Sequence, residues 1–86
     1  MIARRIVYHG KFNTDSLSTV FDITRKIEIT GEVKANGASQ IELNLEGDPS
    51  MIKLIQHQIE RKVTDITDKT VEMIPYQNYA GITLLN

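Results

Sequence analysis

The chain alternates between stretches in which apolar side chains recur at strand spacing and stretches in which they recur at helical spacing. Residues 4–9 form a run of β-formers and predict a strand that ends at Gly10. Residues 13–16 are all good helix caps, and we expect a helix from there to about Lys26. The apolar face of this helix has the expected spacing, with Leu17, Val20, Phe21 and Thr24.

The middle of the chain has the strict alternation of a β-hairpin. Apolar and polar residues alternate over residues 27–35 and again over residues 41–46. Between them, Asn36-Gly37 favours a tight reversal of the chain. We therefore expect an antiparallel hairpin with one apolar and one polar face. Glu42 and Glu46 share the polar face, and we expect both carboxylates to be solvated.

A second helix is predicted directly after Gly47. Asp48 is a favourable N-cap residue, and Pro49 suits the first helical position because its missing N–H is not needed there. The helix is expected to run to about Arg61. Its apolar residues again follow helical spacing, with Ile52, Ile55, Ile59 and Val63 on one face.

The last part of the chain has weaker patterns. Residues 63–68 are interpreted as a polar connection. Residues 71–74 predict a fourth strand, whose end is weakened by Pro75 because proline cannot donate to a strand ladder. Residues 81–85 are apolar enough to form a short fifth strand.

A strand–helix–strand unit thus occurs twice, over residues 4–35 and 40–76. Two such units folded together form an α+β ferredoxin-like βαββαβ sandwich, in which an antiparallel sheet carries both helices on one face. We expect residues 1–86 to form one domain of this kind, because 86 residues are too few for two.

Composition narrows the classes of function. The chain is 24 % charged with a net charge of −1, so we expect no basic face for nucleic acid. No stretch approaches the ~20 apolar residues of a membrane helix. The absence of Cys excludes thiolate chemistry and fits a cytoplasmic protein. His9 and His57 lack a second ligand at useful spacing, so we expect no metal site and no cofactor.

The corner between the first strand and the first helix is the candidate site. The unpaired N–H groups of a first helical turn and the positive end of the helix dipole favour an anion there. The expected ligand is phosphate or another small anion. The candidate anion-binding residues are Gly10, Lys11, Phe12, Asn13, Thr14, Asp15 and Ser16.

Several segments of the chain are similar to motifs of one enzyme family. Residues 10–13 match the start of a loop of the form G-R-V-Q-G-V-G-F-R, and residues 31–34 match a strand of the form G-W-V-x-N. Residues 39–47 follow G-x-V-E-V-x-x-E-G without a gap, and residues 76–82 are similar to a Y-S-N-F-x-I ending. By these segments the chain resembles the acylphosphatases over nearly its whole length.

The resemblance implies particular roles at the corner. In the family, loop N–H groups hold a phosphate, an Arg binds it, and an Asn positions the attacking water. In this chain the Arg position falls on Ser18 or Leu17, and the Asn position falls on Ala35. Asn36 is adjacent, but a shift of one residue turns a strand side chain to the other face. No catalytic residue is therefore assigned, and we expect little or no acylphosphatase activity.

Three functions follow as hypotheses. The first is an acylphosphatase-like domain that has lost catalysis and serves as a binding or interaction module, with a protein partner among the candidate ligands. The second is an active acylphosphatase that hydrolyses carboxylic-phosphoric anhydrides with Lys11, Asn13 and the loop amides. The third is a small-molecule regulatory domain that pairs through its sheet. A monomer or a weak dimer is expected.

Overall fold

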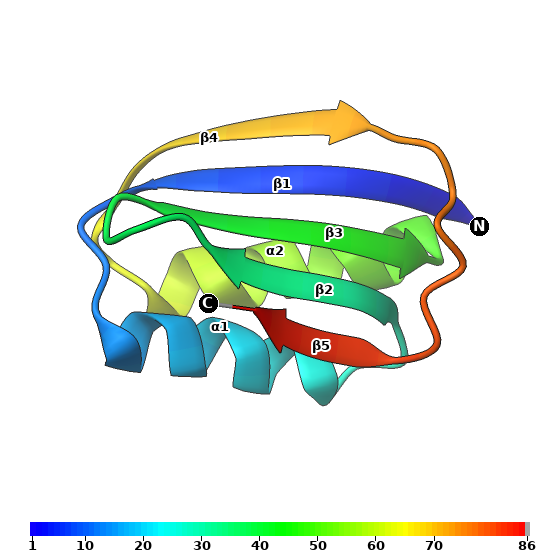
Figure 1. Ribbon diagram of the computed structural model, residues 1–86, viewed down its shortest axis with the longest axis horizontal. Coiled ribbons are helices and arrows are strands. Elements are labelled where there is room, and N and C mark those ends of the chain that lie inside the picture. The colour runs from blue at the N-terminus through cyan, green and yellow to red at the C-terminus, as the bar shows by residue number, and fades with distance from the viewer. Residues whose placement is uncertain (86) are drawn as a thin grey trace.

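The computed structural model describes residues 1–85 as one five-stranded sheet with two helices packed on one of its faces (Figure 1). The elements in chain order are β1 (Ile2–Gly10), α1 (Thr14–Arg25), β2 (Thr30–Ala35), β3 (Gln40–Gly47), α2 (Pro49–Lys62), β4 (Ile66–Met73) and β5 (Ile82–Leu85).

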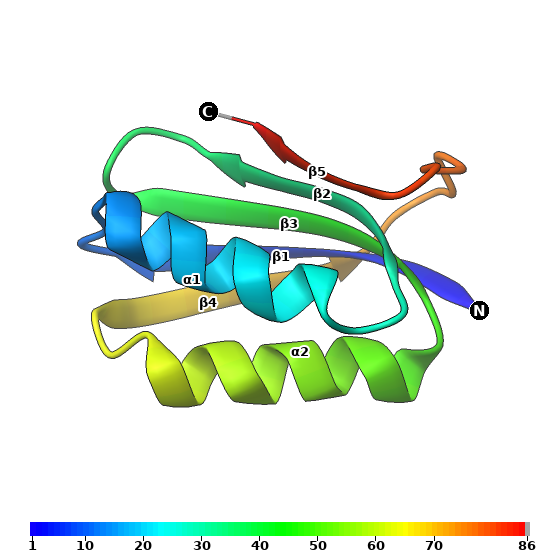
Figure 2. The same ribbon diagram turned by 90° about the horizontal axis from the view of Figure 1, so that it is seen from below.

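The strand order across the sheet is β4-β1-β3-β2-β5. β1 pairs antiparallel with β3 on one side and with β4 on the other, and β2 pairs antiparallel with β3. The fifth strand predicted from residues 81–85 is present, and it pairs with β2 in the parallel direction. Seen from the helix side, α1 lies under the middle of the sheet and α2 follows the β4 side (Figure 2). The predicted ferredoxin-like βαββαβ order is confirmed.

The core lies between the helices and the sheet. β1, β2 and β3 contribute alternate apolar residues, as the pattern predicted, whereas β4 and β5 are largely exposed. Among the fully buried side chains are Ile6, Tyr8, Val33, Leu43, Ile52 and Ile59. The Tyr8 hydroxyl crosses the core and donates a 3.0 Å hydrogen bond to Glu60 of α2. Burial, and then the Glu60 carboxylate, raise the pKa of this hydroxyl far above its usual value, so it remains a donor.

The cap predicted for α2, Asp48, is confirmed, and α1 is capped by Asn13, the first of the four capping residues that the sequence left open. The Asn13 side chain accepts a hydrogen bond from the Ser16 N–H, and the Ser16 hydroxyl accepts one from the Asn13 N–H. Asp48 accepts the Ser50 N–H, with Pro49 in the first turn. Within residues 1–85 neither helix is long and apolar enough to cross a membrane.

Two predicted boundaries were wrong. The strand expected over residues 27–35 begins only at Thr30, which pairs with Glu46 near the end of β3, so residues 27 and 28 lie beyond the last residue of that strand. Residues 63–68 were expected as a connection, yet β4 begins at Ile66. This strand lies at the edge of the sheet and is largely exposed, so its first residues do not need the apolar alternation of a half-buried strand.

The sheet face opposite the helices carries a network of polar side chains. Arg5 donates to Asn44 at 2.9 Å and to Glu72 at 3.2 Å. Asn44 in turn donates to Glu32 and Glu42. These contacts join four strands across the face, which is the polar face that the alternating pattern predicted.

Candidate functional site: the corner between β1 and α1

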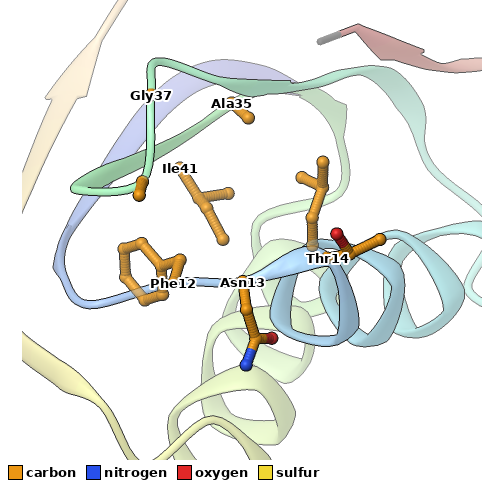
Figure 3. A pocket seen from close by; sticks show the side chains of 8 residues that line it. Phe12, Asn13, Thr14, Ala35, Gly37 and Ile41 are labelled. Carbon is orange, nitrogen blue, oxygen red and sulfur yellow. The ribbon is translucent and has the colours of Figure 1, made fainter.

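A hollow of about 400 Å³ opens where the loop after β1 meets the hairpin between β2 and β3. Figure 3 shows the side chain of Ile41 beside the ring of Phe12, with Ala35 and Gly37 above them. The side chains come from the loop, the first turns of α1 and both arms of the hairpin. The lining residues are Phe12, Asn13, Thr14, Leu17, Ala35, Gly37, Ala38 and Ile41.

Backbone hydrogen bonds fix the loop against its neighbours. The Phe12 N–H donates to the Ala38 carbonyl at 2.8 Å, and the Gly10 N–H donates to the Ser39 carbonyl at 3.1 Å. On the other side, the Lys11 N–H donates to the Asp65 carbonyl at 3.3 Å. Glycine is required at position 10, because a Cβ there would lie 2.0 Å from the same Asp65 oxygen. The loop thus lies between the hairpin and the start of β4.

The N–H groups of this loop are directed to different acceptors. Those of Gly10, Lys11 and Phe12 donate to three separate backbone carbonyls, and those of Asn13 and Ser16 are used in the cap of α1. Within residues 1–85 the structure records no hydrogen bond for the N–H groups of Thr14 and Asp15. These two amides are the donors that remain for a ligand at the first helical turn.

No residue that lines the hollow is charged. Leu17 contributes to its wall, whereas Ser18 is exposed and lies outside the lining. Ala35 lines the hollow from the end of β2. Lys11 is exposed outside it, and Asp15 borders a separate, smaller hollow with Lys62 and Asp65. The walls of the corner hollow are therefore neutral and mostly apolar.

The seven candidate anion-binding residues are contiguous, but the structure divides them between two sides of the loop. Phe12, Asn13 and Thr14 line the corner hollow, while Asp15 and Ser16 line the smaller one together with Asn13. The Asn13 amide points away from Ala35 and Gly37 (Figure 3), toward its capping partner. In the described chain, residues 1–85, no group of three or more His, Asp or Glu is placed to hold a metal ion.

The hairpin residues of the hollow were not found from the sequence. Gly37, Ala38 and Ile41 lie more than twenty positions away from the loop, and the backbone bonds from Phe12 to Ala38 and from Gly10 to Ser39 show that the hairpin adjoins it. Asn36-Gly37 marked the hairpin turn, and Gly37 does adopt a positive φ of 70°. That signal located the turn without showing what the turn contacts.

A second group of converging N–H donors lies at the opposite end of the sheet. The N–H groups of Gln77, Asn78 and Tyr79 all donate to the side chain of Glu46. Glu46 is only 3 % exposed, so the expectation that it is solvated was wrong. The loop before β5 folds over this end of β3, and its backbone replaces the water that the carboxylate would otherwise bind.

The structural comparisons agree on the fold. The crystal structure of an acylphosphatase from Bacillus subtilis superposes with a TM-score of 0.88 and 17 % identity, covering 100 % of both chains. An acylphosphatase from Coxiella burnetii superposes with a TM-score of 0.84 and 16 % identity, covering 96 % of this chain and 90 % of that one. The chain has an acylphosphatase-like fold. No protein-family model matches the sequence, and neither does any curated protein.

The acylphosphatase-like architecture is also similar to that of a different kind of protein. The BlrP1 BLUF structure superposes with a TM-score of 0.66 and 17 % identity, covering 100 % of this chain and 66 % of that one. Likeness at this level of identity concerns the fold alone, and one fold supports many functions. The function of this acylphosphatase-like chain therefore has to be argued from its own corner residues.

Proposed function

We propose that the chain is a non-catalytic acylphosphatase-like domain that binds a small, uncharged and largely apolar molecule in the corner hollow. The observation that carries this proposal is the neutral lining of that hollow. A phosphate site needs positive charge or several converging donors, because a dianion gives up much hydration energy on binding. The corner hollow of this chain has neither among its lining side chains.

The shape and chemistry of the walls suggest the kind of ligand. Phe12, Leu17 and Ile41 contribute apolar surface to the lining. The N–H groups of Thr14 and Asp15 lie at the start of α1, where a carbonyl oxygen would be a suitable acceptor. A ligand with an apolar body and one carbonyl group matches both the apolar walls and the two amides. The volume of about 400 Å³ is enough for a small aromatic ring that carries a carbonyl group.

The same residues argue against acyl-phosphate hydrolysis. The resemblance assigns the phosphate-binding Arg to Ser18 or to Leu17, which lies in the wall of the hollow, and it assigns the water-positioning Asn to Ala35. Loss of a single group that stabilises the transition state typically lowers the rate about 10²–10³-fold. With both groups missing, the remaining amides of Thr14 and Asp15 supply too little stabilisation for efficient turnover.

The experiment is a hydrolysis assay with benzoyl phosphate, with the Bacillus subtilis acylphosphatase as the positive control. We expect a rate equal to the uncatalysed one. Enzyme-like turnover that is lost in Lys11→Ala or Asn13→Ala would support the alternative of an active enzyme with a rearranged site, and it would overturn the proposal. The Lys26→Ala variant is the matched control, because Lys26 is an equally exposed cation at the far end of α1.

The ligand class is tested by substitution in the wall of the hollow. Ala35→Asp places a carboxylate beside the proposed apolar site, and Ala80→Asp makes the same change at an exposed position outside it. We expect benzamide, a neutral molecule with a ring and one carbonyl group, to bind the unmodified protein and the Ala80 variant equally. Binding to the Ala35 variant should be at least about threefold weaker, because a buried charge has to be desolvated.

A further inference from the structure

The outer edge of β4 carries backbone groups that no other strand within residues 1–85 pairs, although the Lys69 N–H donates to the side chain of its neighbour Asp68 at 2.8 Å. Ile74 N–H donates to the Ala3 carbonyl at 3.1 Å, which makes this pair a hydrogen-bonded one in the antiparallel ladder. Because hydrogen-bonded and non-bonded pairs alternate, the N–H and C=O groups of Lys69, Val71 and Met73 point away from β1. β4 is the last strand on its side of the sheet, so these groups face outward.

The side chains of the same three residues lie on the helix side of the sheet. They oppose Tyr8, Ile6 and Arg4 in the ladder, and Lys69 reaches Glu60 of α2. Val71 is 41 % exposed and Met73 is 62 % exposed. The edge therefore presents a short apolar strip directly beside its free backbone groups.

A positively charged groove of about 450 Å³ adjoins this strip, between α2 and β4. Figure 2 shows the two elements running alongside each other. Glu60 is the one carboxylate in the lining, and it already accepts hydrogen bonds from Lys69 and Tyr8. Within residues 1–85 the structure records no ion pair for Arg4 or Lys53. The groove is lined by Arg4, Lys53, Gln56, His57, Glu60 and Lys69.

A second copy of the chain fits this edge poorly. Antiparallel self-pairing centred on Lys69, Thr70 or Glu72 places like charges directly opposite each other, which destabilises a sheet. Pairing centred on Val71 avoids this, but it sets Lys69 against Met73 of the other copy. It also brings two positively charged grooves to the same face of the joined sheet, because a two-fold axis normal to the sheet keeps the helices on one side.

We propose that the β4 edge is a docking site for an extended segment of a protein partner that has apolar and acidic side chains on one face. Such a segment would add a sixth strand and place its acidic side chains near Lys69, Lys53 and Arg4. This site is separate from the corner hollow, and it does not depend on the function proposed for that hollow.

The register of β4 defines the sequence that the segment needs. Apolar side chains suit the positions opposite Met73 and Val71, and an acidic one suits the position opposite Lys69. On the other face of the sheet, a basic side chain suits the position opposite Glu72. In the antiparallel direction these requirements give Val-Lys-Val-Thr-Glu. The peptide Val-Glu-Val-Thr-Lys has the same composition with the charges exchanged and is the matched control.

The test is titration of the folded protein with each peptide, blocked at both ends, followed through backbone amide resonances and amide hydrogen exchange. We expect Val-Lys-Val-Thr-Glu to slow exchange at Val71 and Met73, and to bind about threefold to tenfold more tightly than the control peptide. Equal binding of the two peptides, or no change at these amides at millimolar peptide, would overturn the proposal.

Two variants separate backbone pairing from charge. Val71→Pro removes an outward N–H without touching the ladder to β1, and it should abolish binding, whereas Val71→Thr should retain it. Lys69→Glu should abolish the preference between the two peptides, because each then has one matched and one mismatched charge pair with positions 69 and 72. This variant covers the case in which the proline variant fails to fold. Sedimentation of the protein without peptide measures its oligomeric state. A dimer that Val71→Pro abolishes would assign the edge to a second copy and would also overturn the proposal.

Discussion

The corner loop and the loop before β5 each present several backbone N–H groups, and the two loops differ in where those groups point. In the corner loop, the N–H groups of Gly10, Lys11 and Phe12 donate to three separate carbonyls. In the loop before β5, three successive N–H groups converge on the Glu46 carboxylate. Asn78 has a positive φ of 58°, which helps successive amides to face one point. Only the second loop has the geometry of an anion site, and its anion is part of the chain.

The difference shows that a strand-to-helix corner is not sufficient for anion binding. The corner has the position and the helix dipole that favour an anion, but its donors hold the hairpin and β4 in place. The Glu46 site has no helix terminus, yet its donors converge and water is excluded. Convergence of donors, rather than their number, separates a binding site from a structural loop.

The largest effect is expected from Glu46→Ala. This change leaves the N–H groups of residues 77–79 without their acceptor, and it should lower the free energy of unfolding by about 3 kcal/mol. Urea unfolding measures the loss, and the three amides should exchange faster with solvent. Glu72→Ala is the control: its ion pair with Arg5 is exposed, so the loss should be under about 1 kcal/mol. Equal losses of unfolding free energy in the two variants would show that the three N–H groups converging on Glu46 add no stability beyond that of an exposed ion pair.

A smaller effect is expected when the corner loop is forced away from its neighbours. Gly10→Ala introduces a Cβ that would lie 2.0 Å from the Asp65 oxygen. Unfolding should become easier by about 2 kcal/mol, since backbone atoms have to move apart. At Gly81 an added Cβ meets nothing within 4 Å, so Gly81→Ala is the matched control. A stable Gly10 variant with unchanged spectra would contradict the close packing of this loop.

The cap of α1 gives a third, more modest test. Asn13→Ala removes the acceptor of the Ser16 N–H and should cost about 1 kcal/mol of stability by thermal or urea unfolding. Asn13→Asp keeps an acceptor at the same place and should retain the stability. If instead Asn13→Ala were neutral and lowered binding of benzamide, Asn13 would be a ligand-binding residue rather than a cap.

The smallest effect concerns pH at the start of α2. The hydrogen bonds from Ser50 lower the pKa of the exposed Asp48 carboxyl in the folded state. A lowered pKa stabilises the fold at pH values above the unfolded pKa, and this contribution is lost as pH falls through the folded one. The stability difference between the unmodified protein and Asp48→Asn should therefore shrink on acidification. By contrast, the stability difference between the unmodified protein and Asn13→Ala should not change with pH, because the Asn13 cap is neutral.

Much of the fold could be predicted from local patterns. The cap Asp48 and the alternation in β2 and β3 depend on near neighbours along the chain, and the structure confirms them. For α1 the sequence left four capping residues open, and the structure selects Asn13. The start of β4 could not be predicted, because an exposed edge strand lacks the apolar alternation that marks a buried one. Polar residues such as Thr67 and Asp68 look the same in a loop as on a sheet edge.

The site was less predictable than the fold because it depends on distances through space. The sequence left Ser18 and Leu17 as alternatives, and only the packing of α1 shows that Leu17 contributes to the hollow. Ala38 and Ile41 adjoin the loop through the sheet register. Glu46 looked like any other polar residue on an alternating strand, because the loop that covers it lies about thirty residues later.

Whether the corner hollow binds a neutral molecule rather than an anion is tested by titrating the isotope-labelled protein with benzamide, benzoate and inorganic phosphate. The titration is followed through the amide and methyl resonances of the protein. We predict saturable shifts with benzamide at Phe12, Leu17 and Ile41, weaker ones with benzoate, and none with phosphate up to millimolar concentration. Saturable phosphate shifts at the amides of residues 10–16, without any response to benzamide, would contradict the account and restore the corner as an anion site.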